Sequence, residues 1–184
     1  MDLALPGLPS LTARPFGGEA DYQAIADLVL AEALADGQDG FVLTAEDVEV
    51  SFRHAEHLDL VEGCRIVEAG GVPIAYVITR WYDEVDGPRV YRHMCKVAED
   101  WRGKGIGTAM LHWAQRHLAE VAAAHGTDRP RVYRTDIDRI GSGAEALLEA
   151  SGYRSIQHGA GLVRHSLADI PDLPLPAGVE IRPV

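Results

Sequence analysis

Three glycines alternate with other residues in one short stretch of the chain, and two basic side chains lie among them. Glycine has no side chain, so consecutive backbone amides in such a stretch can close around an anion. The stretch also opens the longest predicted helix, whose first turn carries a partial positive charge. We therefore predict a pyrophosphate-binding cradle made of Arg102, Gly103, Lys104, Gly105, Ile106, Gly107 and Thr108.

Other glycine-rich loops bind phosphates with different spacings. A P-loop requires the run G-x-x-x-x-G-K-[ST], which this sequence lacks. A dinucleotide-binding fold requires G-x-G-x-x-G early in a strand–helix–strand unit, whereas Gly103, Gly105 and Gly107 have another spacing and follow several predicted strands. A glycine-rich helix start that holds no ligand stays open as an alternative.

Hydrophobic periodicity and turn residues predict the elements that position this stretch. Helices are expected over 18–37, 44–57, 105–126 and 144–150, and strands over 65–69, 72–81, 90–97 and 131–135, with one or two closing strands over 153–164. The two glycines at 70 and 71 predict a tight hairpin turn, and Thr44 followed by Asp47 predicts a weak capping box at the start of the second helix. This order indicates an α/β (α+β) domain, in which helices cover a mixed sheet.

Length and composition are those of one globular domain. The chain has 184 residues and a net charge of −11, which argues against nucleic-acid binding. Its two cysteines, Cys64 and Cys95, are far apart, so neither a disulfide framework nor a cysteine zinc site is expected. No signal peptide or membrane span is recognised, and we expect a cytoplasmic protein that binds neither nucleic acid nor membranes.

The C-terminal tail differs from the rest of the chain. Four prolines punctuate residues 169–184, which therefore look like a linker that follows a domain at 1–168. The segment 175–184 also resembles 8–16, about one domain length earlier. The tail is thus either a proline-rich linker or the start of a second, absent copy of the domain.

Two sequence blocks resemble the GNAT superfamily of acyl-CoA-dependent N-acyltransferases. The family's R/Q-x-x-G-x-G/A signature, found between a strand and a helix, is similar to Arg102–Gly107. A second block, A-x-x-L-Y-E-x-x-G-F/Y, is similar to Ala144–Tyr153. The ending from Leu162 to Val184 looks like the junction in two-domain GNAT proteins of the mycothiol-synthase-like kind, of which this chain resembles the N-terminal half.

The resemblance implies a GNAT-like fold, with a mostly antiparallel mixed sheet, and acetyl-CoA as co-substrate without a metal. It implies that the pantetheine arm pairs like an added strand with Cys95, Lys96 and Val97. The implied reaction is N-acetyl transfer to a small-molecule amine by direct attack in a ternary complex. A homodimer or a tandem partner domain is also expected from the resemblance.

The same resemblance does not identify the residues that transfer protons in this chain. Leu148 stands where the family commonly has a tyrosine acid, and Gly141 aligns with an asparagine. His93 and Tyr91 alternate with Cys95 on one predicted strand face, so we take His93 and Tyr91 as catalytic candidates, with His93 as the base. A packed strand histidine is the alternative for His93, and a buried inert thiol is favoured over a covalent acyl-enzyme for Cys95.

These departures also favour a second function class. The chain would then be a non-catalytic acyl-CoA-binding or structural half of a tandem protein. Both classes bind CoA, but only the enzyme releases free thiol when an amine is added. No motif identifies the acceptor.

Overall fold

The computed structural model describes residues 2–35, 37, 40–139, 141–157 and 174–180. The chain divides into two compact units, Met1–Gly152 and Tyr153–Val184. In the second unit, residues 153–157 have no regular secondary structure and residues 174–180 contain a turn. Most of the predicted closing strands and of the proline-rich tail lie outside the described residues, so these predictions stay untested.

The first unit contains both helices and strands. In chain order its elements are β1 (Leu11–Pro15), α1 (Glu19–Ala35), α2 (Ala45–Arg53), α3 (Leu60–Gly63), β2 (Cys64–Ala69), β3 (Val72–Asp83), β4 (Arg89–Val97), a 3-10 turn (Glu99–Trp101), α4 (Ile106–Ala123), β5 (Arg131–Arg134) and α5 (Gly143–Ala150).

The strands form one five-stranded sheet in the order β1-β2-β3-β4-β5. The first three neighbouring pairs are antiparallel, and β4 with β5 is parallel. Gly70 and Gly71 form the β2–β3 turn with φ angles of 59° and 84°, which only glycine adopts readily. The mixed, mostly antiparallel sheet flanked by helices confirms the predicted fold class.

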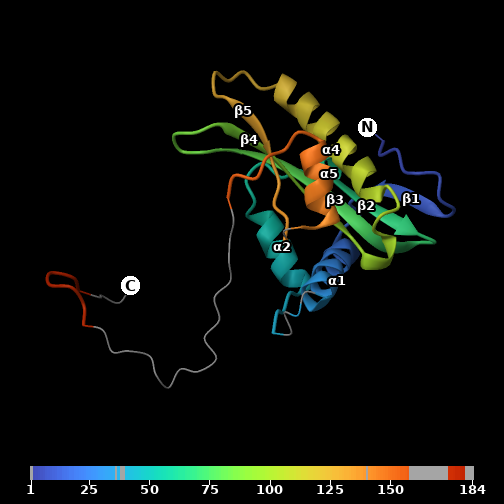
Figure 1. Cartoon of the computed structure of the whole chain (residues 1–184), viewed down its shortest axis with the longest axis horizontal. Helices are drawn as coiled ribbons and strands as arrows, with labels where there is room; N and C mark the ends of the chain where they lie inside the picture. Colours follow the sequence, from blue (N-terminus) through green and yellow to red (C-terminus); the bar gives the residue numbers. More distant parts are fainter. Residues whose placement is uncertain (1, 36, 38–39, 140, 158–173, 181–184) are drawn as a thin grey trace. The chain divides into compact units, whose positions relative to one another are not determined.

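Helices cover both faces of the sheet (Figure 1). On one face α4 buries Ile106, Met110 and Trp113 against β2 and β3. On the other face α1 and α2, which contact each other, bury residues such as Ile25 and Val48 against the same two strands. Because side chains alternate along a strand, odd-numbered residues of β4 face α4 and even-numbered ones face α1 and α2.

Local signals explain most helix boundaries. The predicted capping box of α2 is present, because the Thr44 side chain accepts from the Asp47 amide while the Asp47 carboxylate accepts from the Thr44 amide. Gly105, with φ 84°, is the N-cap of α4. The helix ends at Ala123, three residues before the predicted end. Its C-cap residue is Ala124, which has right-handed helical φ and ψ angles, so the predicted glycine cap is not used.

Two short elements were not predicted. Strand β1 pairs with β2 along one edge, although it ends in a proline. Helix α3 is a single turn capped by the Asp59 side chain, which accepts from the amides of Val61 and Glu62. Neither segment is long enough to show a period. Among the residues the structure describes, no helix has the length and apolarity that crossing a bilayer requires.

Candidate functional site: an amide cradle beside an open strand edge

The loop before α4 presents six consecutive backbone amides. Gly103 and Gly105 have φ angles of 70° and 84°, so the chain turns twice through conformations that favour glycine. Among the described residues, no acceptor receives a hydrogen bond from the amides of 103–108. In the described part of the chain, only water or a ligand is left to satisfy these donors, which are the amides predicted to form the cradle.

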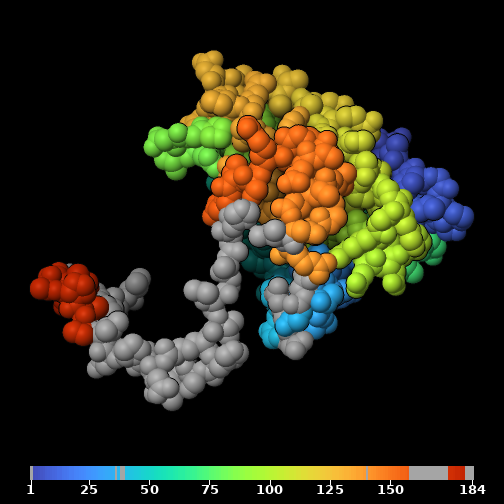
Figure 2. Space-filling view, in the orientation of Figure 1, coloured from blue at the N-terminus to red at the C-terminus, as the bar shows by residue number. Residues whose placement is uncertain are grey.

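The charge around this loop suits an anion. Helices α1, α2 and α5 carry an acidic residue in the first turn, whereas α4 carries none. The Lys104 ammonium lies 4.7 Å from the centre of the Trp101 ring, which holds this cation beside the loop. Figure 2 shows the loop, in yellow-green, on the surface of the first unit. The donor set and the positive helix end fit a pyrophosphate.

Glu32 of α1 links two cations of this region. Its carboxylate accepts from Arg102 Nη2 at 2.8 Å and also pairs with Lys96, which in turn pairs with Asp138. Burial opposes the charge on Lys96, but these two carboxylates raise its pKa above the ordinary value. Neither Glu32 nor Asp138 could be found from the sequence pattern, because each lies far from Lys96 along the chain.

Among the residues that the structure describes, the second half of β4 has a free edge on the β5 side. Pairing with β5 stops at Arg92, whereas pairing with β3 continues to Val97. The Arg89 amide donates to Pro130 O on the β5 side at 2.8 Å, so the backbone groups of odd-numbered residues point to that side. Cys95 and Val97 therefore direct their amides and carbonyls to the free edge. Such an edge can accept an extended amide-bearing chain as an added strand.

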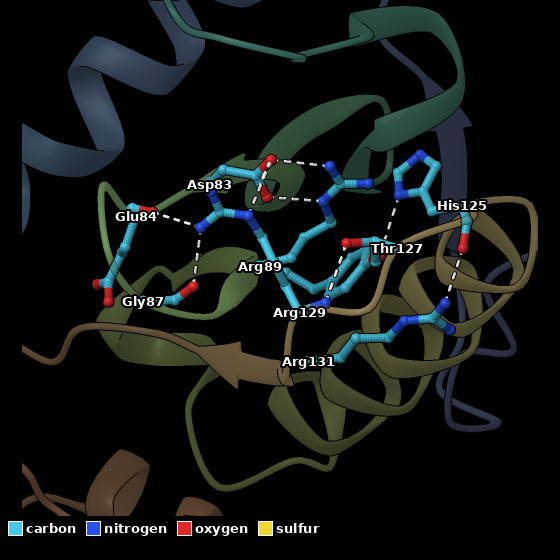
Figure 3. Close-up of polar contacts among 9 residues, drawn as sticks. Asp83, Glu84, Gly87, Arg89, His125, Thr127, Arg129 and Arg131 are labelled. Atoms are coloured by element: carbon cyan, nitrogen blue, oxygen red, sulfur yellow. Dashed lines mark hydrogen bonds and ion pairs between the residues drawn. The ribbon is translucent and has the colours of Figure 1, made fainter.

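Side-chain hydrogen bonds hold β5 to the start of β4 (Figure 3). Arg129, just before β5, donates from Nη1 to Glu84 O at 2.7 Å and to Gly87 O at 2.9 Å in the β3–β4 turn. In the same turn region Arg89 makes two hydrogen bonds to Asp83, of 2.7 and 2.8 Å. Within the described residues, the two parallel strands are thus joined at this end and unpaired beyond Arg92 and Arg134.

The catalytic candidates lie on the α4 face of β4 and are buried. His93 is 2% exposed, and burial lowers its pKa to about 4, so the imidazole is neutral near pH 7. Tyr91 is also buried, and its hydroxyl is 3.0 Å from Nδ1 of His125. Burial raises the pKa of the Cys95 thiol to about 12, which keeps this sulfur protonated and poorly nucleophilic.

Helix α5 lies against the start of α4. A Cβ built on Gly107 would stand 3.7 Å from Cδ2 of Leu147, an ordinary contact distance. Leu148, the residue at the place of the family's tyrosine, is half-buried on the same helix. The Gly141 amide donates to the Glu145 carboxylate, so a backbone group closes the loop where the family often has asparagine.

The sheet thus has one parallel pair, which separates next to a glycine-rich helix start. The chain belongs to the acetyltransferase (GNAT) family, whose family model matches residues 25–129. This result confirms the family predicted from the two sequence blocks. Members of this family use acetyl-CoA. Among curated proteins, none matches the chain in sequence.

Solved structures give the same fold. A GCN5-related N-acetyltransferase from Sphaerobacter thermophilus is 26% identical with a TM-score of 0.59, over 82% of this chain and 45% of that chain. The chain thus spans under half the length of that protein. A Salmonella typhimurium protein solved with its cofactor acetyl-CoA is 17% identical, with a TM-score of 0.57 over 79% of this chain and 80% of that chain.

A third similar structure is the ribosomal-protein alanine N-acetyltransferase of Escherichia coli. It is 16% identical with a TM-score of 0.54, over 80% of this chain and 79% of that chain. At such identities the last two similarities establish the fold alone.

The two glycines of the family signature have different structural requirements, and matched alanine substitutions separate them. Gly105→Ala places a side chain at φ 84° and should lower the free energy of unfolding by roughly 1–2 kcal/mol. Gly107→Ala meets only Leu147 at contact distance and should raise it by about 0.5–1 kcal/mol. Urea unfolding of both variants measures the difference. Equal effects would contradict the assigned loop geometry.

The buried His93 makes stability depend on pH. Its folded pKa of about 4 lies below the value of 6.5 for a free histidine, so the unfolded chain binds the extra proton between these values. Stability is unaffected above pH 6.5 and falls as the pH drops toward 4. We expect wild type to lose about 2 kcal/mol more than His93→Gln between pH 7.5 and 5, measured by urea unfolding. Parallel losses in both proteins would show that His93 is not the group responsible.

Proposed function

We propose that this protein is an N-acetyltransferase that moves an acetyl group from acetyl-CoA to a small-molecule amine in a ternary complex. The observation that carries this proposal is the run of six amides at 103–108 without acceptors among the described residues, beside the free edge of β4. Family membership supports acyl transfer in general. The small-molecule amine as acceptor and the transfer within a ternary complex are parts of this proposal.

The roles of the binding residues follow from their positions. The amides of 103–108, with Arg102 and Lys104, would hold the pyrophosphate. Backbone groups of Cys95 and Val97 would pair with the two amides of the pantetheine arm, while Lys96 ties the strand to Glu32 and Asp138 on the opposite face. When bound, acetyl-CoA supplies the thioester that the amine attacks.

The amine must lose a proton as it attacks, and we propose His93 as the group that takes it. Support comes from its neutral state near pH 7 and its position one residue past the last pair between β4 and β5. Tyr91 lies two residues earlier on the same strand face. The hydrogen bond between its hydroxyl and His125 would help to fix this part of the strand.

A non-catalytic role is the second candidate. Leu148 and Gly141 stand where the family commonly has tyrosine and asparagine, so a usual proton donor is missing. The chain would then bind acyl-CoA as one half of a tandem protein. Both candidates predict CoA binding, and release of free thiol with an added amine distinguishes them.

Calorimetric titration with CoA and acetyl-CoA tests the cradle. Wild type should bind with micromolar affinity, and the double variant Arg102→Ala/Lys104→Ala should bind about 100-fold more weakly, because two charge-assisted contacts are lost. Arg116→Ala, on the exposed side of α4, is the matched control and should bind like wild type. A folded wild type that binds neither molecule would overturn the cofactor assignment.

His93→Gln tests the proposed base. We expect kcat to fall about 100-fold with little change in KM for acetyl-CoA, in an assay of thiol release with an amine panel. Tyr91→Phe, which keeps the ring and removes the hydrogen bond to His125, should lower kcat less. An unchanged kcat in His93→Gln would make this histidine a packing residue.

A further inference from the structure

Three arginines stand side by side across the sheet. Arg80 of β3 pairs in register with Arg92 of β4, and Arg92 pairs with Arg134 of β5. Residues directly opposite in neighbouring strands share a face, so all three lie on the face that α1 and α2 cover. This row crosses the sheet at the last level where β4 and β5 are paired.

Such a row is unfavourable unless negative charge balances it, because like charges directly opposite repel. Arg134 pairs with Glu84 at 2.6 Å, and Arg92 pairs with Asp136. Arg80 has no carboxylate partner in the described part of the chain, although the whole sequence holds 28 acidic residues against 17 basic ones. One positive charge is therefore left unbalanced here in an acidic protein.

A cavity opens at this place. It has a volume of ≈ 390 Å³ and lies between α2 and the central parts of β3 and β4, with Arg80, Arg92 and Met94 among its lining residues. Ser51 of α2 and His54, the C-cap residue of that helix, add polar groups. Nε of Arg92 is buried and has no hydrogen-bond partner among the described residues. The volume is at the lower end for small-molecule sites, so the fitting ligand is small.

We infer that this cavity binds the carboxylate of the acceptor, and that the acceptor is a small amine that also carries a carboxylate. This inference rests on the proposed acetyl transfer, because only that reaction would make the bound amine an acceptor. Guanidinium groups bind carboxylates in a planar, two-point manner, and one surplus positive charge matches one carboxylate better than a doubly charged phosphate. Arg92 is the last residue of β4 that pairs with β5, so a carboxylate held there lies about 3 Å, or one residue, along the strand from the start of the free edge.

Methionine methyl NMR tests this without any turnover. The chain has three methionines, of which Met94 lines the cavity and Met110 lies in the core beneath α4. In protein labelled at the methionine methyls, 4-aminobutanoate should shift the Met94 signal with saturation and leave Met110 unchanged. Butylamine, which lacks the carboxylate, should bind at least about tenfold more weakly.

Two glutamine variants localise the effect. Arg80→Gln should weaken 4-aminobutanoate binding by at least about tenfold, since the arginine without a carboxylate partner is removed. Arg53→Gln, on α2 but outside the cavity lining, changes the net charge equally and should bind like wild type. The Met110 signal reports whether each variant keeps its core. An unchanged affinity in a folded Arg80→Gln would overturn the inference.

A further probe separates carboxylate from phosphate, and the readouts separate this inference from the proposed function. If 3-aminopropylphosphonate shifts Met94 and 4-aminobutanoate does not, the carboxylate assignment is wrong. If 4-aminobutanoate binds through Arg80 while CoA does not bind in calorimetry, the carboxylate-binding cavity is supported and the proposed acetyl transfer is overturned. If CoA binds, and amines with and without a carboxylate are acetylated with the same KM, the carboxylate-binding cavity is overturned and the proposed acetyl transfer is supported.

Discussion

The parallel pairing of β4 with β5 lasts four residues, and the position where it stops determines the rest of the site. A parallel pair needs a crossover helix, and here α4 is that helix, so its amino end necessarily lies beside the carboxyl end of β4. Had β5 continued alongside β4, the backbone groups of Cys95 and Val97 would be occupied. In the part of the chain that the structure describes, the short pairing instead leaves a free strand edge next to six amides without acceptors, and one extended anionic molecule can contact both.

Basic side chains are scarce in this protein, so their placement is informative. Arg102 and Lys104 are neighbours in sequence, and glycines surround them, so the cradle could be predicted from the sequence alone. The row of Arg80, Arg92 and Arg134 could not, because the register of three strands brings these residues together from distant parts of the chain. Spacing predicts a site only when one segment supplies most of its groups.

The same distinction holds for the fold. The hairpin at 70–71 and the cap made by Thr44 and Asp47 are local, and both were predicted because neighbouring residues alone determine them. Strand β1 was missed because its stability comes from distant partners. It pairs with β2, and Arg14 also forms ion pairs of 2.7 Å with Asp21 of α1 and with Glu68 of β2. No pattern within five residues contains that information.

The free edge of β4 has a consequence for the protein's behaviour in concentrated solution. Unpaired amides and carbonyls on a strand are a template on which a strand of another molecule can add, which is a route to aggregation. Here Nε of Arg102 donates to the carbonyl of Val97 at 3.1 Å, so a charged side chain covers the last acceptor of that edge. Arg102, which we propose as a phosphate ligand, therefore also covers part of this edge against the addition of a strand from another molecule.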